Sequence, residues 1–184
     1  MRSTILALGA VLIFILAAPA IAHHAVPGLT MGSFEQALLS GIGDPILGVN
    51  HLIFVLAMGA AAAFAGVLVA GSLAAIAAMM LGCFLIGLPV GLPVQEMLVG
   101  FAIVSLCVIV ASQRRLSRLL LASLFAGIGL LYGAGFGATI VTHGSDAAVE
   151  AFAGYMLGLC VTQTIMALGS GLIARRLRLR AETA

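Results

Sequence analysis

Residues 43–63 read GDPILGVNHLIFVLAMGAAAA, an apolar run that begins among an aspartate, an asparagine and a histidine. About 20 apolar residues cross a bilayer core of roughly 30 Å as a helix. Polar side chains are costly at that depth, so Asp44, Asn50 and His51 are candidate site residues. Helix capping needs no ligand: Asp44 as the N-cap and Pro45 as the first helical residue form an ordinary helix start, and these positional preferences favour the cap for Asp44.

The composition extends this reading to the whole chain. Of 184 residues, 63% are hydrophobic and 8% are charged, and the mean hydropathy is +1.28. Further apolar runs are long enough to cross a bilayer, so we predict an all-α, polytopic transmembrane helix bundle. No phosphate loop, zinc-protease motif or nucleophile–base pair is present, so we expect neither an enzyme nor a nucleic-acid partner. The three cysteines all fall inside apolar runs and predict no disulfide framework.

The first 22 residues have the pattern of a signal peptide. Arg2 precedes an apolar segment, and Ala20 and Ala22 give the small-x-small pattern of a signal-peptidase site. Cleavage after Ala22 makes His23 the new N-terminus, followed by His24. The predicted organisation is therefore a signal peptide over residues 1–22 and a single helical transmembrane domain over residues 23–184.

Five membrane spans are predicted after the signal peptide. They cover residues 45–65, 67–87, 93–112, 116–140 and 148–174. Arginines lie between the third and fourth spans and after the fifth, and the positive-inside rule puts both groups in the cytoplasm. Five crossings then give a periplasmic mature N-terminus and a cytoplasmic C-terminus. We expect a multi-pass protein of a bacterial inner membrane, with the lipid bilayer as its first partner.

This topology gathers the histidines and most of the carboxylates on the periplasmic side. Imidazole and carboxylate groups there suit the capture of nickel, cobalt, copper or zinc, although the composition alone is equally explained by loops that are simply wetter than lipid. The metal would be a substrate, and no resident cofactor is predicted. The candidate ligands are His51, Glu96, Asp44, Asn50, His23, His24 and His143.

Two of these candidates are predicted to meet. His51 and Glu96 lie at similar depth from the same face, so they form either part of a metal site or an interhelical hydrogen bond. Asp44 and His51 share a helix face, but seven residues separate them by about 10.5 Å in an unbroken helix. One ion reaches both only where the chain bends, and Gly48 is the residue that would permit the bend.

Several of these stretches resemble the HupE/UreJ family of small membrane proteins. The segment GIGDPILGVNHLIFVLAMGAAAA resembles the family signature, in which Pro45, Gly48 and His51 match, while Asp44 and Asn50 replace a histidine and an aspartate. PVQEMLVGFAIVSLCVIV is similar to the family's third helix and would carry over Glu96. GYMLGLCVTQ resembles its fifth helix. In LLYGAGFGA, Tyr132 stands where the family shows a histidine late in the fourth span.

The resemblance implies the transport or periplasmic capture of a divalent transition metal, with nickel or cobalt first. The alternative is a degenerate, non-transporting membrane subunit or scaffold of a larger complex. Glycines repeat every four residues in the fourth and fifth spans, which predicts close helix packing and offers faces for a homo-oligomer or a membrane-protein complex. These glycines are Gly129, Gly133, Gly137, Gly154 and Gly158.

Overall fold

The described part of the chain is helical apart from a few connecting residues. The computed structural model describes residues 33–85, 101, 104–106, 116–143 and 149–183. Its helices are α2 (Phe34–Leu47), α3 (Val49–Phe64), α4 (Leu68–Leu85), α6 (Arg118–His143) and α7 (Val149–Thr183). No strand occurs among these residues, so the predicted all-α class is confirmed.

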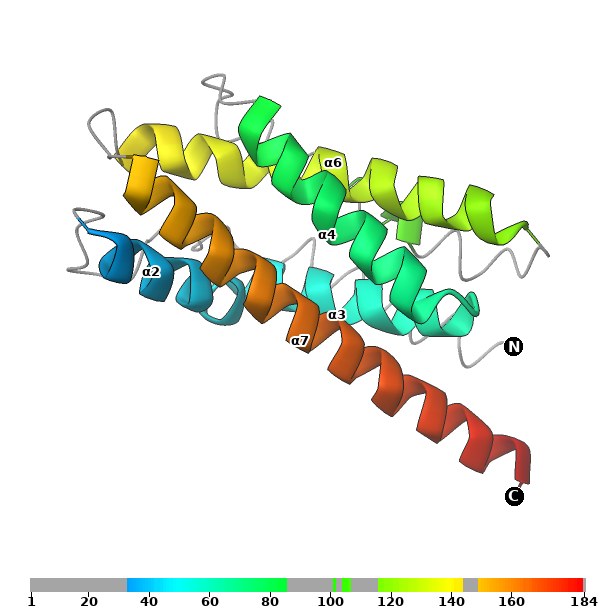
Figure 1. Cartoon of the computed structure of the whole chain (residues 1–184). Helices are drawn as coiled ribbons and strands as arrows, with labels where there is room; N and C mark the ends of the chain where they lie inside the picture. Colours follow the sequence, from blue (N-terminus) through cyan, green and yellow to red (C-terminus); the bar gives the residue numbers. More distant parts are fainter. Residues whose placement is uncertain (1–32, 86–100, 102–103, 107–115, 144–148, 184) are drawn as a thin grey trace.

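The helices pack side by side along one long direction (Figure 1). α7 packs against α2 along its first half and against α3 further on, whereas α4 packs mainly on α6. α2 and α3 together lead from the end where α7 begins towards the end where it finishes, with a bend between them, and α4 and α6 run the opposite way (Figure 1). The buried core lies between these two groups and includes Phe54, Phe125, Tyr132 and Tyr155.

α2 begins eleven residues before the first predicted span, which was placed at residues 45–65. Ser33 is its N-cap, and the Ser33 hydroxyl accepts a hydrogen bond from the Gln36 amide at 3.3 Å. The sequence Ser-x-x-Gln is the pattern of a capping box. Pro45 is inside α2, in its last turn. Asp44 is therefore a helical residue, and its interpretation as the N-cap is wrong.

The chain bends sharply between α2 and α3. Pro45 lacks an N–H group and cannot donate to the carbonyl of Gly41, which weakens the end of α2. Gly48 then has extended backbone angles of φ −78° and ψ 103°, and its N–H donates to the Asp44 carbonyl. The axes of the two helices differ by 74°. The bend that one ion would require near Gly48 is present.

Local signals also set the other helix ends. Gly66 adopts a φ of +76° just after α3, a left-handed conformation that glycine tolerates best, and the chain reverses there into α4. The Ser117 hydroxyl accepts a hydrogen bond from the Leu120 amide at 3.2 Å at the start of α6. Serine is among the preferred N-cap residues, so this start follows from the sequence.

Glycines allow the helix backbones to touch. A Cβ atom at Gly133 would lie 2.1 Å from the Met79 carbonyl oxygen, and one at Gly158 would lie 2.4 Å from that of Leu38. The predicted close packing is confirmed at Gly129, Gly133, Gly154 and Gly158. Gly137 lies in α6, but its surroundings are outside the described side chains.

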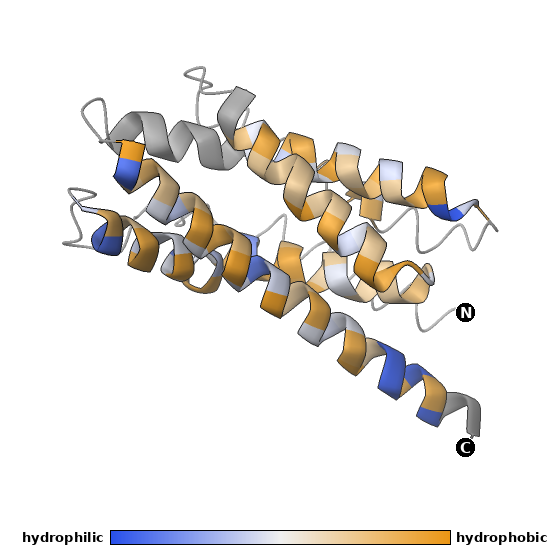
Figure 2. Cartoon of the chain, viewed as in Figure 1, coloured by the Kyte–Doolittle hydropathy of each residue, from blue (hydrophilic) through white to orange (hydrophobic). Residues whose placement is uncertain are grey.

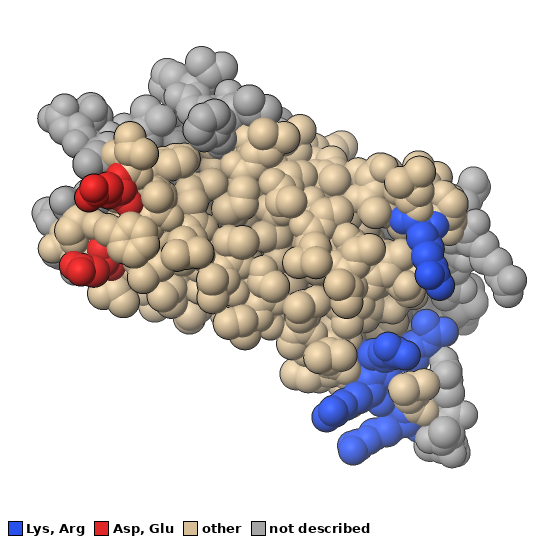
Figure 3. All heavy atoms as spheres, viewed as in Figure 1, with Lys and Arg blue, Asp and Glu red and all other residues tan. Residues whose placement is uncertain are grey.

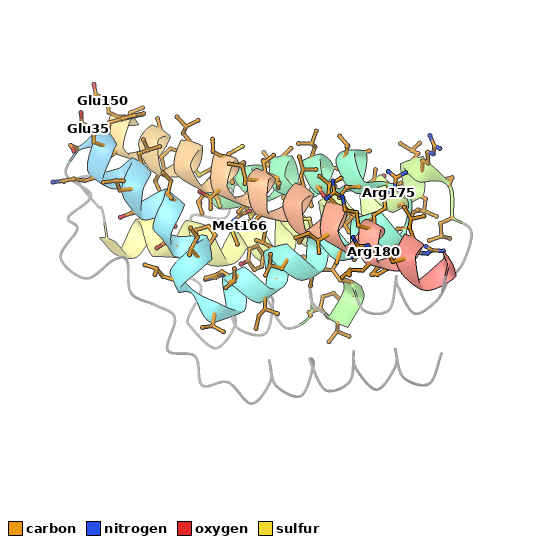
Figure 4. The ribbon with its side chains drawn as sticks, turned by 90° about the horizontal axis from the view of Figure 1, so that it is seen from below. Glu35, Glu150, Met166, Arg175 and Arg180 are labelled. Atoms are coloured by element: carbon orange, nitrogen blue, oxygen red, sulfur yellow. The ribbon has the colours of Figure 1, made fainter. Side chains whose placement is uncertain are left out.

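The surface separates charge from apolar area. Figure 3 shows the acidic side chains at one end, the arginines at the other, and an uncharged band between them. Glu35 and Glu150 lie together at the first end, and Arg175 and Arg180 lie at the opposite one (Figure 4). Figure 2 shows the hydrophobic residues along the helices between these ends. Large apolar side chains are exposed there, and Ile165 is 67% exposed.

Some of the described helices have the length and composition that crossing a bilayer requires. Among the described residues, Val149–Arg180 of α7 is long and apolar enough to cross a membrane, and α2 with α3 qualifies as one span broken by the bend. α4 and α6 contain shorter apolar stretches. The count of five spans therefore remains a prediction. The third predicted span, residues 93–112, lies outside the described residues apart from 101 and 104–106, and so does the signal peptide.

Candidate functional site

Asp44 in α2 is bound by a tyrosine from α7. The Tyr155 hydroxyl donates to Asp44 Oδ2 at 2.5 Å. Tyr155 is fully buried, whereas Asp44 is half-buried. A hydrogen bond to a carboxylate is among the stronger ones available to a side chain, so this contact compensates part of the cost of removing Asp44 from water.

The close approach of α2 and α7 determines this contact. A Cβ atom at Gly41 would lie 2.1 Å from the Tyr155 carbonyl oxygen and 3.0 Å from the Leu159 amide nitrogen. Only a residue without a Cβ fits between these backbones. Gly41 in α2 and Gly158 in α7 therefore allow the backbone of Tyr155 to lie beside the helical turn of α2 that precedes Asp44.

His51 in α3 is bound by the other tyrosine, Tyr132 of α6. His51 Nδ1 and the Tyr132 hydroxyl share a hydrogen bond. The two rings meet edge to face, with centroids 5.5 Å apart and an interplanar angle of 78°. Phe54, three residues after His51 and one helical turn further on, stacks on Tyr132 with a centroid distance of 3.7 Å. This stacking fixes the phenol that His51 contacts.

The bend at Gly48 positions His51. A Cβ atom at Gly48 would lie 2.6 Å from His51 Cδ2 and 3.0 Å from the Asp44 carbonyl oxygen. The imidazole therefore folds back over the backbone of the bend. Asp44 is in the last turn before the bend and His51 is in the first turn after it, so the break between α2 and α3 carries both ionisable groups.

The two hydrogen-bonded pairs form one polar cluster. Asp44 from one pair and His51 from the other lie on either side of the bend at Gly48, each about one helical turn from it. The tyrosine cluster, defined here as Asp44, His51, Tyr132 and Tyr155, thus joins α2, α3, α6 and α7. Its chemistry comprises one carboxylate, one imidazole and two phenols.

This cluster contains two side chains of the kinds that bind transition metals in proteins. A carboxylate and an imidazole bind nickel, cobalt, copper and zinc, and each now has a phenol as a hydrogen-bond partner. In the described part of the chain, no group of three or more His, Cys, Asp or Glu side chains could hold a metal ion. A bound ion would need further ligands from water or from other residues.

The other predicted ligands are not placed beside the cluster by any described contact. Asn50 lies in α3 and His143 is the last residue of α6, but their side chains are outside the described set. His23, His24 and Glu96 lie outside the described residues altogether. The contact between His51 and Glu96 stays a prediction.

Tyr132 and Tyr155 were missed as site residues. They are the two tyrosines of the whole chain, and both are fully buried against ionisable groups. Two signals could have indicated them. A phenol inside an apolar span needs a hydrogen-bond partner, and Tyr132 occupies a position at which the resembling family shows a histidine.

Comparison with known proteins gave one finding. A family model described as "HupE / UreJ protein" matches residues 11–184, which includes every described helix. No curated protein and no solved structure matches the chain.

Proposed function

Because this chain belongs to the HupE/UreJ family, we propose that it binds a divalent transition metal at Asp44 and His51 and carries it across the membrane. The family is membrane-associated and is generally linked to nickel or cobalt transport. Its members are transporter-like or accessory proteins, not known enzymes. Nickel and cobalt are therefore the first candidate substrates.

The observation that carries this proposal is the position of both ionisable groups at one helix break. Discontinuous helices commonly form ion sites in transporters, because the unwound backbone and nearby side chains line a polar cavity. Asp44 and His51 flank the break between α2 and α3, and both are half-buried. A carboxylate and an imidazole held at such a bend can approach one ion, as the unbroken helix could not.

The charge distribution supports an orientation in the membrane. We assign the arginine-rich end to the cytoplasm and the end with Glu35 and Glu150 to the periplasm (Figure 4). Asp44 follows Glu35 by nine residues, which is about 13.5 Å along α2. That depth is close to the middle of a hydrocarbon core of roughly 30 Å. A metal would enter from the acidic end.

The tyrosines would hold the site while it is empty. Each phenol bonds to one ligand group, so metal binding must exchange these hydrogen bonds for coordination bonds. Water and the predicted ligand Glu96 would complete the coordination shell. His23, His24, Asn50 and His143 are further candidates for metal capture at the periplasmic side.

The same hydrogen bonds favour a second function. In this second function, the carboxylate and the imidazole bond to the buried phenols solely to hold the helices together. The chain would then be a non-transporting membrane subunit or scaffold of a larger complex. Glycine-rich helix faces would supply the contacts with the other subunits.

Calorimetric titration with nickel separates the two functions. We expect the purified protein to bind nickel, and His51→Ala and Asp44→Asn each to weaken binding at least about tenfold, which is about 1.4 kcal/mol. The double variant should be no weaker than the worse single variant, because residues that share one site are not additive. Glu35→Gln is the matched control, because Glu35 is an acid of the same helix that lies away from the cluster. Absence of binding, with a lowered melting temperature in the variants, would favour the scaffold.

A further inference from the structure

Gln163 of α7 is a buried polar side chain that the tyrosine cluster does not use. It is 0% exposed, and neither Oε1 nor Nε2 has a hydrogen-bond partner in the described part of the structure. Buried carboxamides almost always have partners, because the lost hydrogen bonds to water must be replaced. The Gln163 carboxamide therefore has hydrogen-bonding capacity that the described side chains and backbone do not use.

Gln163 lies further along α7 than the cluster. It follows Tyr155 by eight residues, which is about 12 Å towards the arginine-rich end. Leu159 and Ala167, one turn before and one turn after it, are both fully buried and apolar. The Ala167 carbonyl is against Gly59 of α3, so this part of α7 faces the inner half of the broken span.

A second unpartnered group lies on the neighbouring helix. Ser72 of α4 is 0% exposed, and its hydroxyl also has no hydrogen-bond partner among the described residues. Leu68 contacts the position of Gly171, and α4 runs antiparallel to α7 (Figure 1). Ser72 therefore lies between the level of Gly171 and that of Gln163.

We infer that Gln163 and Ser72 form an inner, water-filled site through which a divalent cation leaves the tyrosine cluster. This inference rests on the proposed function. Buried water typically bonds to about three polar groups that are otherwise unsatisfied. The carboxamide oxygen replaces one water ligand of the cation, while the amide N–H groups donate to buried waters that are not bound to the cation. Because a neutral oxygen binds more weakly than a carboxylate or an imidazole, this site releases the ion towards the cytoplasm.

Thiol labelling tests the water-filled site without any metal. Cys83, Cys107 and Cys160 are first replaced by alanine, and Gln163→Cys is compared with Leu159→Cys on the same helix. A small charged methanethiosulfonate reagent should modify residue 163 at least about tenfold faster, because the reagent and the thiolate both require water. Equal rates at the two positions would overturn the inference.

Nickel transport in proteoliposomes tests the role of the site with the native cysteines present. Gln163→Leu should reduce the initial nickel uptake at least about tenfold and change equilibrium nickel affinity less than about twofold, whereas Gln163→Asn should keep part of the uptake. Unchanged nickel uptake in Gln163→Leu, with a higher melting temperature, would show that Gln163 only fills space in the core and would defeat the inference. A wild-type protein that binds no nickel would instead defeat the proposed function, and the labelling result would still decide whether the site contains water.

Discussion

α7 and the pair α2–α3 follow the same direction through the bundle, yet α7 is continuous over 35 residues and α2–α3 is broken by a 74° bend. The broken helix carries Asp44 and His51, and the continuous helix supplies Tyr155 and Gln163. A break sacrifices backbone hydrogen bonds, which is costly in an apolar surrounding. The comparison indicates that the continuous helix provides a packing surface, while the interrupted helix positions the two proposed ligand groups.

The largest expected effect concerns the contact between the two helices. Gly158→Ala places a Cβ 2.4 Å from the Leu38 carbonyl oxygen and forces α2 away from α7. We expect a loss of about 3 kcal/mol in the free energy of unfolding, at the upper end for overpacking. Gly169→Ala is the matched control on α7, since nothing lies within 4 Å of its Cβ. Equal melting temperatures for the two variants would contradict close contact between the backbones of α2 and α7.

Removing a phenol should affect stability and metal binding in opposite directions. Tyr155→Phe removes the hydrogen bond from the phenol to the Asp44 carboxylate, so the free energy of unfolding should fall by about 2 kcal/mol. Nickel affinity should rise, because the metal no longer competes with that hydrogen bond. Melting curves and nickel titration of the same sample measure both quantities.

Tyr132→Phe is the companion variant, and its loss should be nearer about 1 kcal/mol because its partner His51 is an imidazole rather than a carboxylate. A fall in nickel affinity in either phenylalanine variant would mean that the phenol is itself a ligand and would reverse this part of the account.

The bend itself can be tested at Gly48. Its angles of φ −78° and ψ 103° suit any residue, so alanine adds no backbone strain there. The new Cβ would instead press on the His51 ring, 2.6 Å from Cδ2. We expect Gly48→Ala to cost about 1–2 kcal/mol of stability and to weaken nickel binding together. Unchanged nickel binding would show that crowding of the His51 ring at the bend does not affect the metal site.

The smallest expected effect is at Gly66, after the broken helix has ended. Nothing lies within 4 Å of its Cβ, but its φ of +76° disfavours alanine. Gly66→Ala should cost about 1 kcal/mol through the backbone alone and leave nickel affinity unchanged. Thermal unfolding and nickel titration together distinguish Gly66→Ala from Gly48→Ala. A loss of nickel affinity in Gly66→Ala would contradict the claim that only Gly48 is near the metal site.

Much of the helical framework could be predicted from hydropathy. The predicted spans 67–87 and 116–140 lie close to α4 and α6. α7 extends to Thr183, nine residues past the predicted end at 174, because its arginine-rich continuation stays helical after its hydropathy falls. Hydropathy reports which residues suit lipid, and helix formation does not stop where that preference ends.

The predicted start of the first span, at residue 45, is wrong for a different reason. Asp44 followed by Pro45 matched a helix start, but Ser33 begins the helix earlier and Pro45 is accommodated in the last turn of α2. The capping pattern of the sequence is compatible with a helix start at Ser33 or at Asp44. Packing of the preceding turns on α7, through Gly41 and Gly158, decided between them, and no pattern within one segment reports that contact.

Of the four residues of the tyrosine cluster, the sequence indicated only the carboxylate and the imidazole as candidate site residues. Asp44 and His51 were identified because charges are rare in apolar runs. Tyr132 and Tyr155 were missed because their roles depend on contacts across 81 and 111 residues of sequence. Gln163 was visible as an uncharged polar residue, but its lack of a partner in the described structure is a tertiary property.

Nickel X-ray absorption spectroscopy on the purified, nickel-loaded protein tests the central claim most directly, because it reports the ligands of the ion itself. The account predicts about one nickel per chain in a mixed nitrogen and oxygen shell, with imidazole scattering that falls by one ligand in His51→Ala and is unchanged in Glu35→Gln. A wild-type protein without stoichiometric nickel, or an imidazole signal that is the same in His51→Ala, would contradict it.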